Sequence, residues 1–249
     1  MSAVTTDAII LQGFPYGDTS RILRLLTREH GVRSVMARGA TRPRSKFSGL
    51  LDPFTEGTAT LHLKDTRELQ TLSAFELIRS RQSLGHDLLR FGGASLLAEI
   101  VLRTASEEAQ PDLYDRFAAS LDNLSTTNSA SVESVLLAET WSLIAALGFA
   151  PSLDTCVSCS RSLESGEETR FSYAAGGVLC DACRGAGGGS ALPAHARAAL
   201  LRMLEGEPVP LELTAGHWSL LQRYLDHHVL EGAALRSMSF LNATRDLRG

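Results

Sequence analysis

Two Cys-x-x-Cys pairs place the strongest limit on how this chain can fold. The 249-residue sequence holds four cysteines, Cys156 and Cys159 in one pair and Cys180 and Cys183 in the other, with twenty residues between the pairs. A two-residue gap lets both thiolates of a pair face one tetrahedral metal, and a hairpin between the pairs would bring all four together. Such clustering argues against disulfides that staple a secreted scaffold. The spacing therefore predicts a four-cysteine zinc site.

The segment between the pairs indicates that this zinc is structural. Residues 170–173 and 178–180 alternate around a turn at 174–177, which predicts a β-hairpin. Four thiolates close the metal shell and leave no position for the activated water of a catalytic zinc. The His-x-Glu motif of the zinc deaminases does not accompany the cysteines. We therefore expect the metal to brace the fold.

Five short strands are predicted in the first 80 residues. Period-2 alternation is clearest at 56–63, where Thr58, Thr60 and His62 alternate with apolar residues. Five strands need closure or packing to protect their edges, and a small barrel of the OB type fits their number and spacing. A small β-sandwich is the alternative. The predicted strands cover residues 7–14, 20–27, 31–38, 56–63 and 68–77, with a loop at 39–51.

Helical periodicity replaces the strand pattern from residue 83 to Gly148, and Pro111 suits the first turn of a helix. The stretch between Ser131, as N-cap, and Gly148, as C-terminal stop, is apolar nearly all round, which predicts a helix central to a bundle. Helices resume at 193–204 and 218–230, after a glycine-rich run at 185–190. The predicted fold class is α+β multidomain: an OB-type barrel (1–80), an α-helical domain (81–150 and 191–249) and a zinc-binding insertion with four cysteine ligands (151–190).

Charge is divided unevenly along the chain. The formal net charge is −4, but the first 81 residues hold 12 basic and 8 acidic residues, a net +4, so the remainder carries −8. Between residues 21 and 46, eight basic residues accompany a single acidic one. Such a cluster suits a phosphate backbone, although a charge run is more commonly a solvated face. The candidate DNA-binding residues are Arg21, Arg24, Arg33, Arg38, Arg42, Arg44 and Lys46.

The remaining motifs indicate structure rather than chemistry. Residues 91–97, FGGASLL, lack the spacing of a phosphate-binding loop and predict close contact between helices. We expect Trp141 and Trp218 in the core, and His227 and His228 solvated or half-buried, because adjacent side chains on a helix diverge. No apolar run reaches the roughly 18 residues of a membrane span, and the start does not read as a signal peptide. We expect a cytoplasmic protein that contacts no membrane.

Three stretches of the amino-terminal part carry a family resemblance. They are Tyr16-Gly17-Asp18, the following SRILRLLTREHGVRSVMARGATRPRSKFSGLLDPF, and residues 69–76; the part from Thr27 to Gly39 is the most specific. In these residues the chain resembles the RecO recombination-mediator proteins of bacteria. RecO-like chains have an N-terminal OB barrel and then a helical domain with an inserted four-cysteine zinc unit. This sequence resembles that order over nearly its whole length.

The resemblance implies a non-enzymatic protein of DNA repair and recombination that works at the nucleoid. Such proteins bind single- and double-stranded DNA, anneal complementary strands, associate with RecR and with the C-terminal tail of SSB, and help RecA replace SSB in the RecF pathway. Arg33 and Arg38 match positions where the family's barrel meets DNA, and Arg42, Arg44 and Lys46 occupy the basic loop that follows. Two alternatives remain: a zinc-stabilised protein–protein adaptor without direct DNA binding, and a zinc enzyme, which the closed metal shell disfavours.

Overall fold

The computed structural model describes residues 2–64, 66–185, 189–210, 212, 214–229 and 234–246. Contacts divide the chain into two compact units, Met1–Thr126 with Ser237–Gly249, and Thr127–Arg236. Each unit is described by itself. The predicted boundaries at 1–80, 81–150 with 191–249, and 151–190 stay a prediction, because contacts within one structure do not test which segments fold alone.

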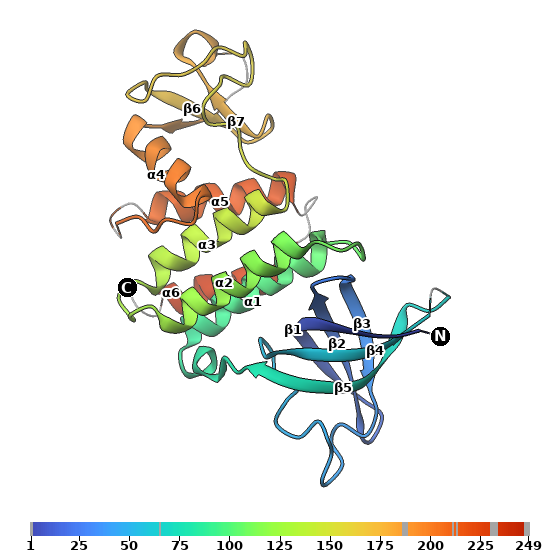
Figure 1. Cartoon of the computed structure of the whole chain (residues 1–249). Helices are drawn as coiled ribbons and strands as arrows, with labels where there is room; N and C mark the ends of the chain where they lie inside the picture. Colours follow the sequence, from blue (N-terminus) through green and yellow to red (C-terminus); the bar gives the residue numbers. More distant parts are fainter. Residues whose placement is uncertain are drawn as a thin grey trace. The chain divides into compact units, whose positions relative to one another are not determined.

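The first unit begins with five strands that form a closed barrel in the order β1-β2-β3-β5-β4 (Figure 1). β3 and β5 pair in parallel, and every other neighbouring pair is antiparallel. This closure confirms the predicted five-stranded barrel and excludes the open sandwich. The strands are β1 Ser2–Tyr16, β2 Ser20–Thr27, β3 Gly31–Ala37, β4 Glu56–Leu63 and β5 Leu69–Arg79.

The barrel interior follows the alternation of the strand sequences. Ala59 and Leu61 of β4 are fully buried, as their pattern predicts. Two further interior residues, Phe47 and Leu51, come from the β3–β4 connection. This connection therefore forms part of the barrel core and is not a free loop. The buried core residues of the strands are Ala8, Ile10, Leu23, Leu25, Val35, Ala37, Ala59, Leu61, Leu72 and Phe75.

Helices complete the first unit: η1 Gln82–His86, α1 Leu88–Thr104, α2 Pro111–Thr126 and α6 Arg236–Asp246. α2 begins at Pro111, as predicted. Gly92 allows α1 and α6 to approach closely, because a Cβ there would lie 2.8 Å from the Phe240 ring. Gly92 thus serves helix packing, as its sequence indicates, whereas α6 itself carries too weak an apolar pattern to have been predicted.

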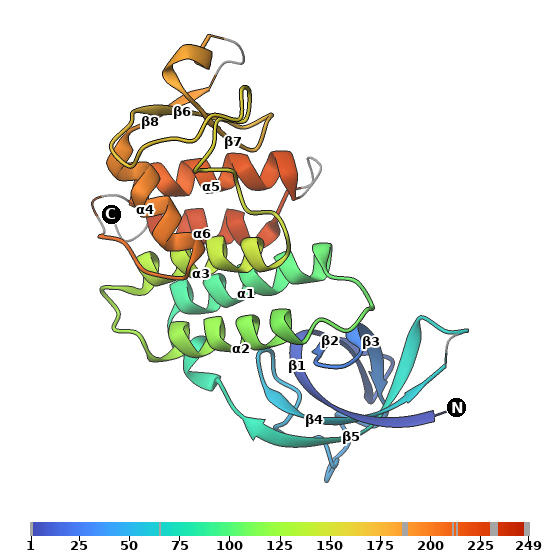
Figure 2. The same ribbon diagram turned by 45° about the horizontal axis from the view of Figure 1, so that its top comes forward.

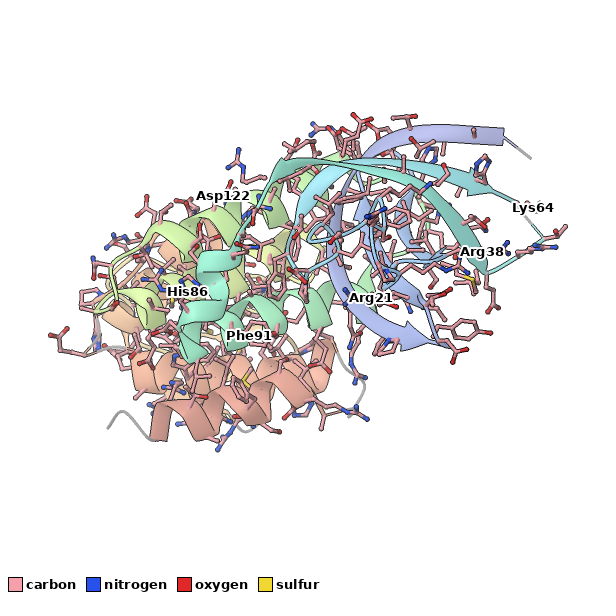
Figure 3. All side chains as sticks on the ribbon, turned by 90° about the horizontal axis from the view of Figure 1, so that it is seen from below. Arg21, Arg38, Lys64, His86, Phe91 and Asp122 are labelled. Atoms are coloured by element: carbon pink, nitrogen blue, oxygen red, sulfur yellow. The ribbon has the colours of Figure 1, made fainter. Side chains whose placement is uncertain are left out.

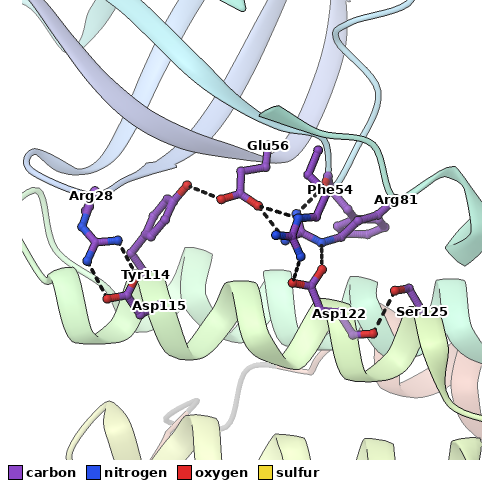
Figure 4. Close-up of polar contacts among 9 residues, drawn as sticks. Arg28, Phe54, Glu56, Arg81, Tyr114, Asp115, Asp122 and Ser125 are labelled. Atoms are coloured by element: carbon purple, nitrogen blue, oxygen red, sulfur yellow. Dashed lines mark hydrogen bonds and ion pairs between the residues drawn. The ribbon is translucent and has the colours of Figure 1, made fainter. Parts of the chain in front are cut away.

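A buried ion-pair network joins the barrel to α2 (Figure 4). The Arg81 side chain is 1% exposed; its Nη2 lies 2.7 Å from Glu56 Oε2 and its Nε 2.7 Å from Asp122 Oδ1. Its Nη1 donates to the Phe54 carbonyl at 3.2 Å. The Tyr114 hydroxyl donates to the other oxygen of Glu56 at 3.1 Å, and its burial, together with that carboxylate, raises the pKa of Tyr114 above its ordinary value.

Replacing Arg81 with methionine should destabilise the first unit by about 3 to 5 kcal/mol, because Glu56 and Asp122 would lose their buried partner. Chemical denaturation measures the change in the free energy of unfolding. Arg79→Met is the matched control: Arg79 also pairs with Asp122, but its side chain is 54% exposed, so its loss should cost about 1 kcal/mol or less. Equal losses in the two variants would contradict the assigned role of Arg81.

The second unit contains α3 Val132–Ala146, β6 Thr169–Ser172, β7 Gly177–Leu179, η2 Asp181–Cys183, β8 Ser190–Leu192, α4 Ala194–Leu204 and α5 Thr214–His228. α3 is buried along most of its length and packs against α4 and α5, which agrees with its all-round apolar pattern. Trp141 and Trp218 are both buried, as predicted. Figure 2 shows the three-stranded β7-β6-β8 sheet near α4 and α5.

The ends of these elements refine the predictions. Gly148 stops α3 with φ +87°, and the Phe149 amide donates to the Ile144 carbonyl at 2.9 Å. Ser131 occupies the N-cap position, but its side chain makes no capping bond there. Leu230, the predicted end of the last helix, and residues 186–188 of the glycine-rich run lie outside the described residues. None of the described helices is long and apolar enough to cross a membrane.

Candidate functional site

The four cysteines converge beside the predicted hairpin. β6 and β7 pair antiparallel around a turn in which Gly176 has φ +69°. The four Sγ atoms lie within 4.8 Å of one another, and all four cysteines are free of disulfides. The Sγ atoms of Cys159 and Cys180 are 3.9 Å apart, close to the edge of about 3.8 Å of a tetrahedron with 2.3 Å metal–sulfur bonds. This donor set fits one tetrahedral metal ion.

Backbone N–H groups favour the thiolate form, which binds metals, at two of the four cysteines. Burial alone would raise the pKa of Cys156, but the backbone N–H groups of Cys180, Cys159 and Ser158 hold it at about 6. The amide of Cys180 lies 3.4 Å from Cys156 Sγ. In Cys180 the backbone of Cys183 similarly outweighs burial and lowers the pKa of the thiol. At Cys183 the Ser158 side chain lowers the pKa, but the neighbouring thiols of Cys180 and Cys159 outweigh it and raise the pKa to about 12.

The cysteine segment has a small apolar core of its own. Cys156, Leu179 and Cys180 are its buried members, and Val157 and Leu163 pack against them with partial exposure. A core of this size supplies little burial energy relative to the entropy of ordering the segment. A bound metal would therefore provide a large part of the stability of this segment.

A second feature is the basic surface on the connection between β3 and β4. We call Arg38, Arg42, Arg44 and Lys46 the basic connection. These four side chains are exposed, and none of them pairs with a carboxylate in the described part of the chain. Successive turns shape the connection: the Ser45 amide donates to the Arg42 carbonyl at 3.0 Å, and apolar side chains at 47 and 51 fix it to the barrel core.

A groove extends this surface and was not predicted. Arg38 lines it together with Lys64, Arg67 and His62 from the end of β4 and the turn that follows, and its volume is about 380 Å³. An adjoining hollow of about 530 Å³ adds Met36. Figure 3 shows Arg38 and Lys64 at the same end of the barrel. The missed signal was the β4–β5 turn itself, since OB barrels use that loop to bind oligonucleotides.

The other predicted arginines lie in different surroundings. Arg33 pairs with the Glu107 carboxylate, and its Nε donates to the His30 carbonyl at 2.8 Å. Arg21 donates to the Leu51 carbonyl at 3.0 Å, whereas Arg24 has its Nε buried without a partner in the described residues. The structure thus brings Arg38, Arg42, Arg44 and Lys46 onto one connection, where Lys46 also donates to the Ser73 carbonyl, and it engages Arg21 and Arg33 within the fold. Their contact with DNA stays a prediction.

Contacts around Arg33 explain its position. The α1–α2 connection packs against the β2–β3 turn, where the Val32 amide donates to the Ser106 carbonyl at 3.0 Å. Gly31 has φ +61°, and a Cβ on it would lie 2.3 Å from the Glu108 carbonyl oxygen. Arg28 makes a similar contact, a two-pronged ion pair with Asp115 of α2. Two arginines of the basic run therefore hold the barrel to the helices of its own unit.

A closed OB-type barrel with a basic groove, followed by helices and a four-cysteine cluster, is the arrangement that the resemblance to the class of recombination mediators predicts. Family models support this class. The model described as "Recombination protein O N terminal" matches residues 1–81, and the model described as "Recombination protein O C terminal" matches residues 85–238. The chain belongs to the RecO family.

Relatives agree with this assignment. The DNA repair protein RecO of Myxococcus xanthus is 30% identical over 246 residues, which cover 97% of this chain and 98% of the relative. The protein of the same name from Anaeromyxobacter dehalogenans is 32% identical over 259 residues, which cover 100% of this chain and 100% of the relative. The protein from Synechococcus elongatus is 34% identical over 71% of this chain and 68% of its own length. The recognition of the family from the amino-terminal residues is confirmed.

Proposed function

We propose that this chain is a DNA repair mediator that binds single- and double-stranded DNA without sequence preference, anneals complementary strands and helps to load RecA onto SSB-coated DNA together with RecR. The observation that carries the proposal is the set of solvent-accessible basic side chains on the β3–β4 connection and in the groove that Arg38 shares with the end of β4 and the β4–β5 turn. Its members are Arg38, Arg42, Arg44, Lys46, Lys64 and Arg67.

Electrostatics supports the binding of a phosphate backbone by this surface. Four of the six cations lie on one connection, and Arg38 shares a groove with Lys64 and Arg67. None of the six is neutralised by a carboxylate of the described residues. If six phosphates are contacted, the logarithm of the binding constant should fall with the logarithm of the salt concentration with a slope of about −4 for single strands.

The metal of the second unit is, in this proposal, a structural Zn²⁺ held by the four cysteines. Four thiolates suit zinc in a closed tetrahedral shell. The loop around the cluster is held by its own ion pair, Arg161 with Glu167, so Arg161 is engaged within the segment. In this proposal the cluster stabilises the unit and carries no catalysis, because four thiolates leave no position for an activated water.

The protein partners rest on membership of the family rather than on a surface of this chain. We propose RecR and the C-terminal tail of SSB as direct partners and RecA as an indirect one. In this scheme the protein works in the cytoplasm at the nucleoid. DNA held along its backbone would leave bases available for pairing, which is what strand annealing requires.

Annealing of complementary strands, with and without SSB, tests the proposal. A fluorescence-quenching assay should show faster duplex formation when the protein is added, also on SSB-coated strands, and the acceleration should decline steeply as salt rises. A protein that binds neither single- nor double-stranded DNA at low salt, yet still binds SSB or RecR, would instead be the adaptor considered from the sequence. That result would overturn the DNA-binding part of the proposal.

A further inference from the structure

The outer face of β1 carries two exposed aromatic side chains that lie outside the basic connection and the groove. Phe14 is 44% exposed and Tyr16 is 52% exposed. They stand two residues apart near the end of the strand, so both point away from the barrel interior on the same side. Large aromatic groups are costly to leave in water, and a contiguous exposed pair indicates a binding surface.

Strand register links Phe14 to the basic groove. Phe14 pairs with Ile22 of β2, Ile22 with Met36 of β3, and Met36 with Thr71 of β5. Cross-strand partners point to the same face of a sheet, so the four side chains form one continuous row. Met36 and Thr71 also line the hollow that contains Arg38 and Arg67. The row that begins at Phe14 therefore ends in the hollow lined by Arg38 and Arg67, where Glu68 is the one acidic residue among the described lining residues.

We propose that Phe14 and Tyr16 form a stacking platform for the bases of single-stranded nucleic acid whose phosphates occupy the basic groove. This inference rests on the proposed function and adds a base-binding element to it. An aromatic face next to a phosphate-binding groove is the combination by which proteins hold single strands without sequence preference. Cations without a carboxylate partner next to exposed aromatic rings also suit nucleic acid better than a purely apolar partner.

The dimensions of the strand suit this ligand. Side chains two residues apart on a strand are separated by about 6.7 Å, close to twice the roughly 3.4 Å per nucleotide of a stacked strand. Each ring can therefore contact its own base, or one base can lie between the two rings. The bases of a duplex are already stacked within the helix, so the platform should contribute to single-strand binding and not to duplex binding.

Two probes separate stacking from phosphate binding: a thymidine strand of about 20 nucleotides, longer than the site of one OB barrel, and an abasic sugar-phosphate strand of the same length. Fluorescence anisotropy gives the affinity of each. Wild-type protein should prefer the thymidine strand. Phe14→Ala and Tyr16→Ala should each weaken thymidine binding about tenfold, leave abasic and duplex binding unchanged, and so reduce the preference. Tyr16→Phe should retain the preference for the thymidine strand, because the aromatic ring is kept.

Leu77→Ala is the matched control, because Leu77 is a 50% exposed apolar residue of β5 outside the row; its affinity for both strands should equal that of wild type. Photocrosslinking of a bromodeoxyuridine strand to wild-type protein adds a test that needs no variant, with adducts expected on Phe14 or Tyr16. Equal wild-type affinity for both strands, with no effect of either alanine, would overturn the platform but leave phosphate binding intact. If the alanine variants lost only the binding of a protein partner, the two rings would be a protein-docking face and the stacking platform would likewise be overturned. Binding of neither strand would refute the proposed function itself.

Discussion

Reversing Arg38, Arg42 and Arg44 to glutamate should weaken single-strand binding at least about a hundredfold at low salt and should reduce the salt slope from about −4 to about −2, because three of six phosphate contacts are lost. Each new carboxylate also repels the strand. Anisotropy titrations over a series of salt concentrations measure both quantities. The three side chains are exposed and have no carboxylate partner in the described residues, so thermal stability and metal content should be unchanged.

Arg202→Glu supplies the control for this triple variant. Arg202 is an exposed arginine of the second unit, paired with Glu207 at 2.8 Å, and its reversal should leave the DNA affinity unaltered. An unchanged affinity and slope in the triple variant would contradict the assignment of the basic connection. Exchanging the pair, Arg33→Glu together with Glu107→Arg, tests whether Arg33 serves the fold through its ion pair. If it does, the exchanged protein should bind DNA like wild type.

Replacing Cys180 with serine should remove the metal and unfold the segment around the cysteines. The fourth ligand is lost, and metal binding of about 10 to 16 kcal/mol exceeds what the small core of Leu179 and its neighbours can supply. Metal content by mass spectrometry should fall from about one zinc per chain to nearly none. Limited proteolysis should then cut between residues 156 and 183, where the wild-type chain resists.

The Cys180→Ser variant also distinguishes a structural role of the metal from a role in DNA binding. Because the cysteines belong to the second unit and the basic connection to the first, DNA affinity at low salt should survive the loss of zinc. Ser165→Ala, in an exposed position of the same segment, should change neither metal content nor proteolysis. A Cys180→Ser protein that keeps its zinc, or a folded segment without it, would contradict a structural metal site.

Local sequence patterns predicted the barrel and the metal cluster well. Alternation over five strands and the two short cysteine gaps each encode geometry within a few residues, so both could be read from the sequence. The groove could not, because Arg38 and Lys64 are brought together only when β3 and β5 pair in parallel. The ion pair of Arg33 with Glu107 depends on a contact across 74 residues. Position along the chain shows that arginines cluster, but the tertiary fold decides which of them remain unpaired.

The insertion of Phe47 and Leu51 into the barrel has a consequence for engineering this family. A connection whose anchors fill the core is already ordered before a ligand arrives, so little conformational entropy is lost on binding. The same anchoring forbids modular exchange: grafting a different sequence between β3 and β4 without two equivalent large side chains would leave a cavity in the barrel. A change in the β3–β4 connection is therefore expected to alter both the affinity for the ligand and the stability of the barrel.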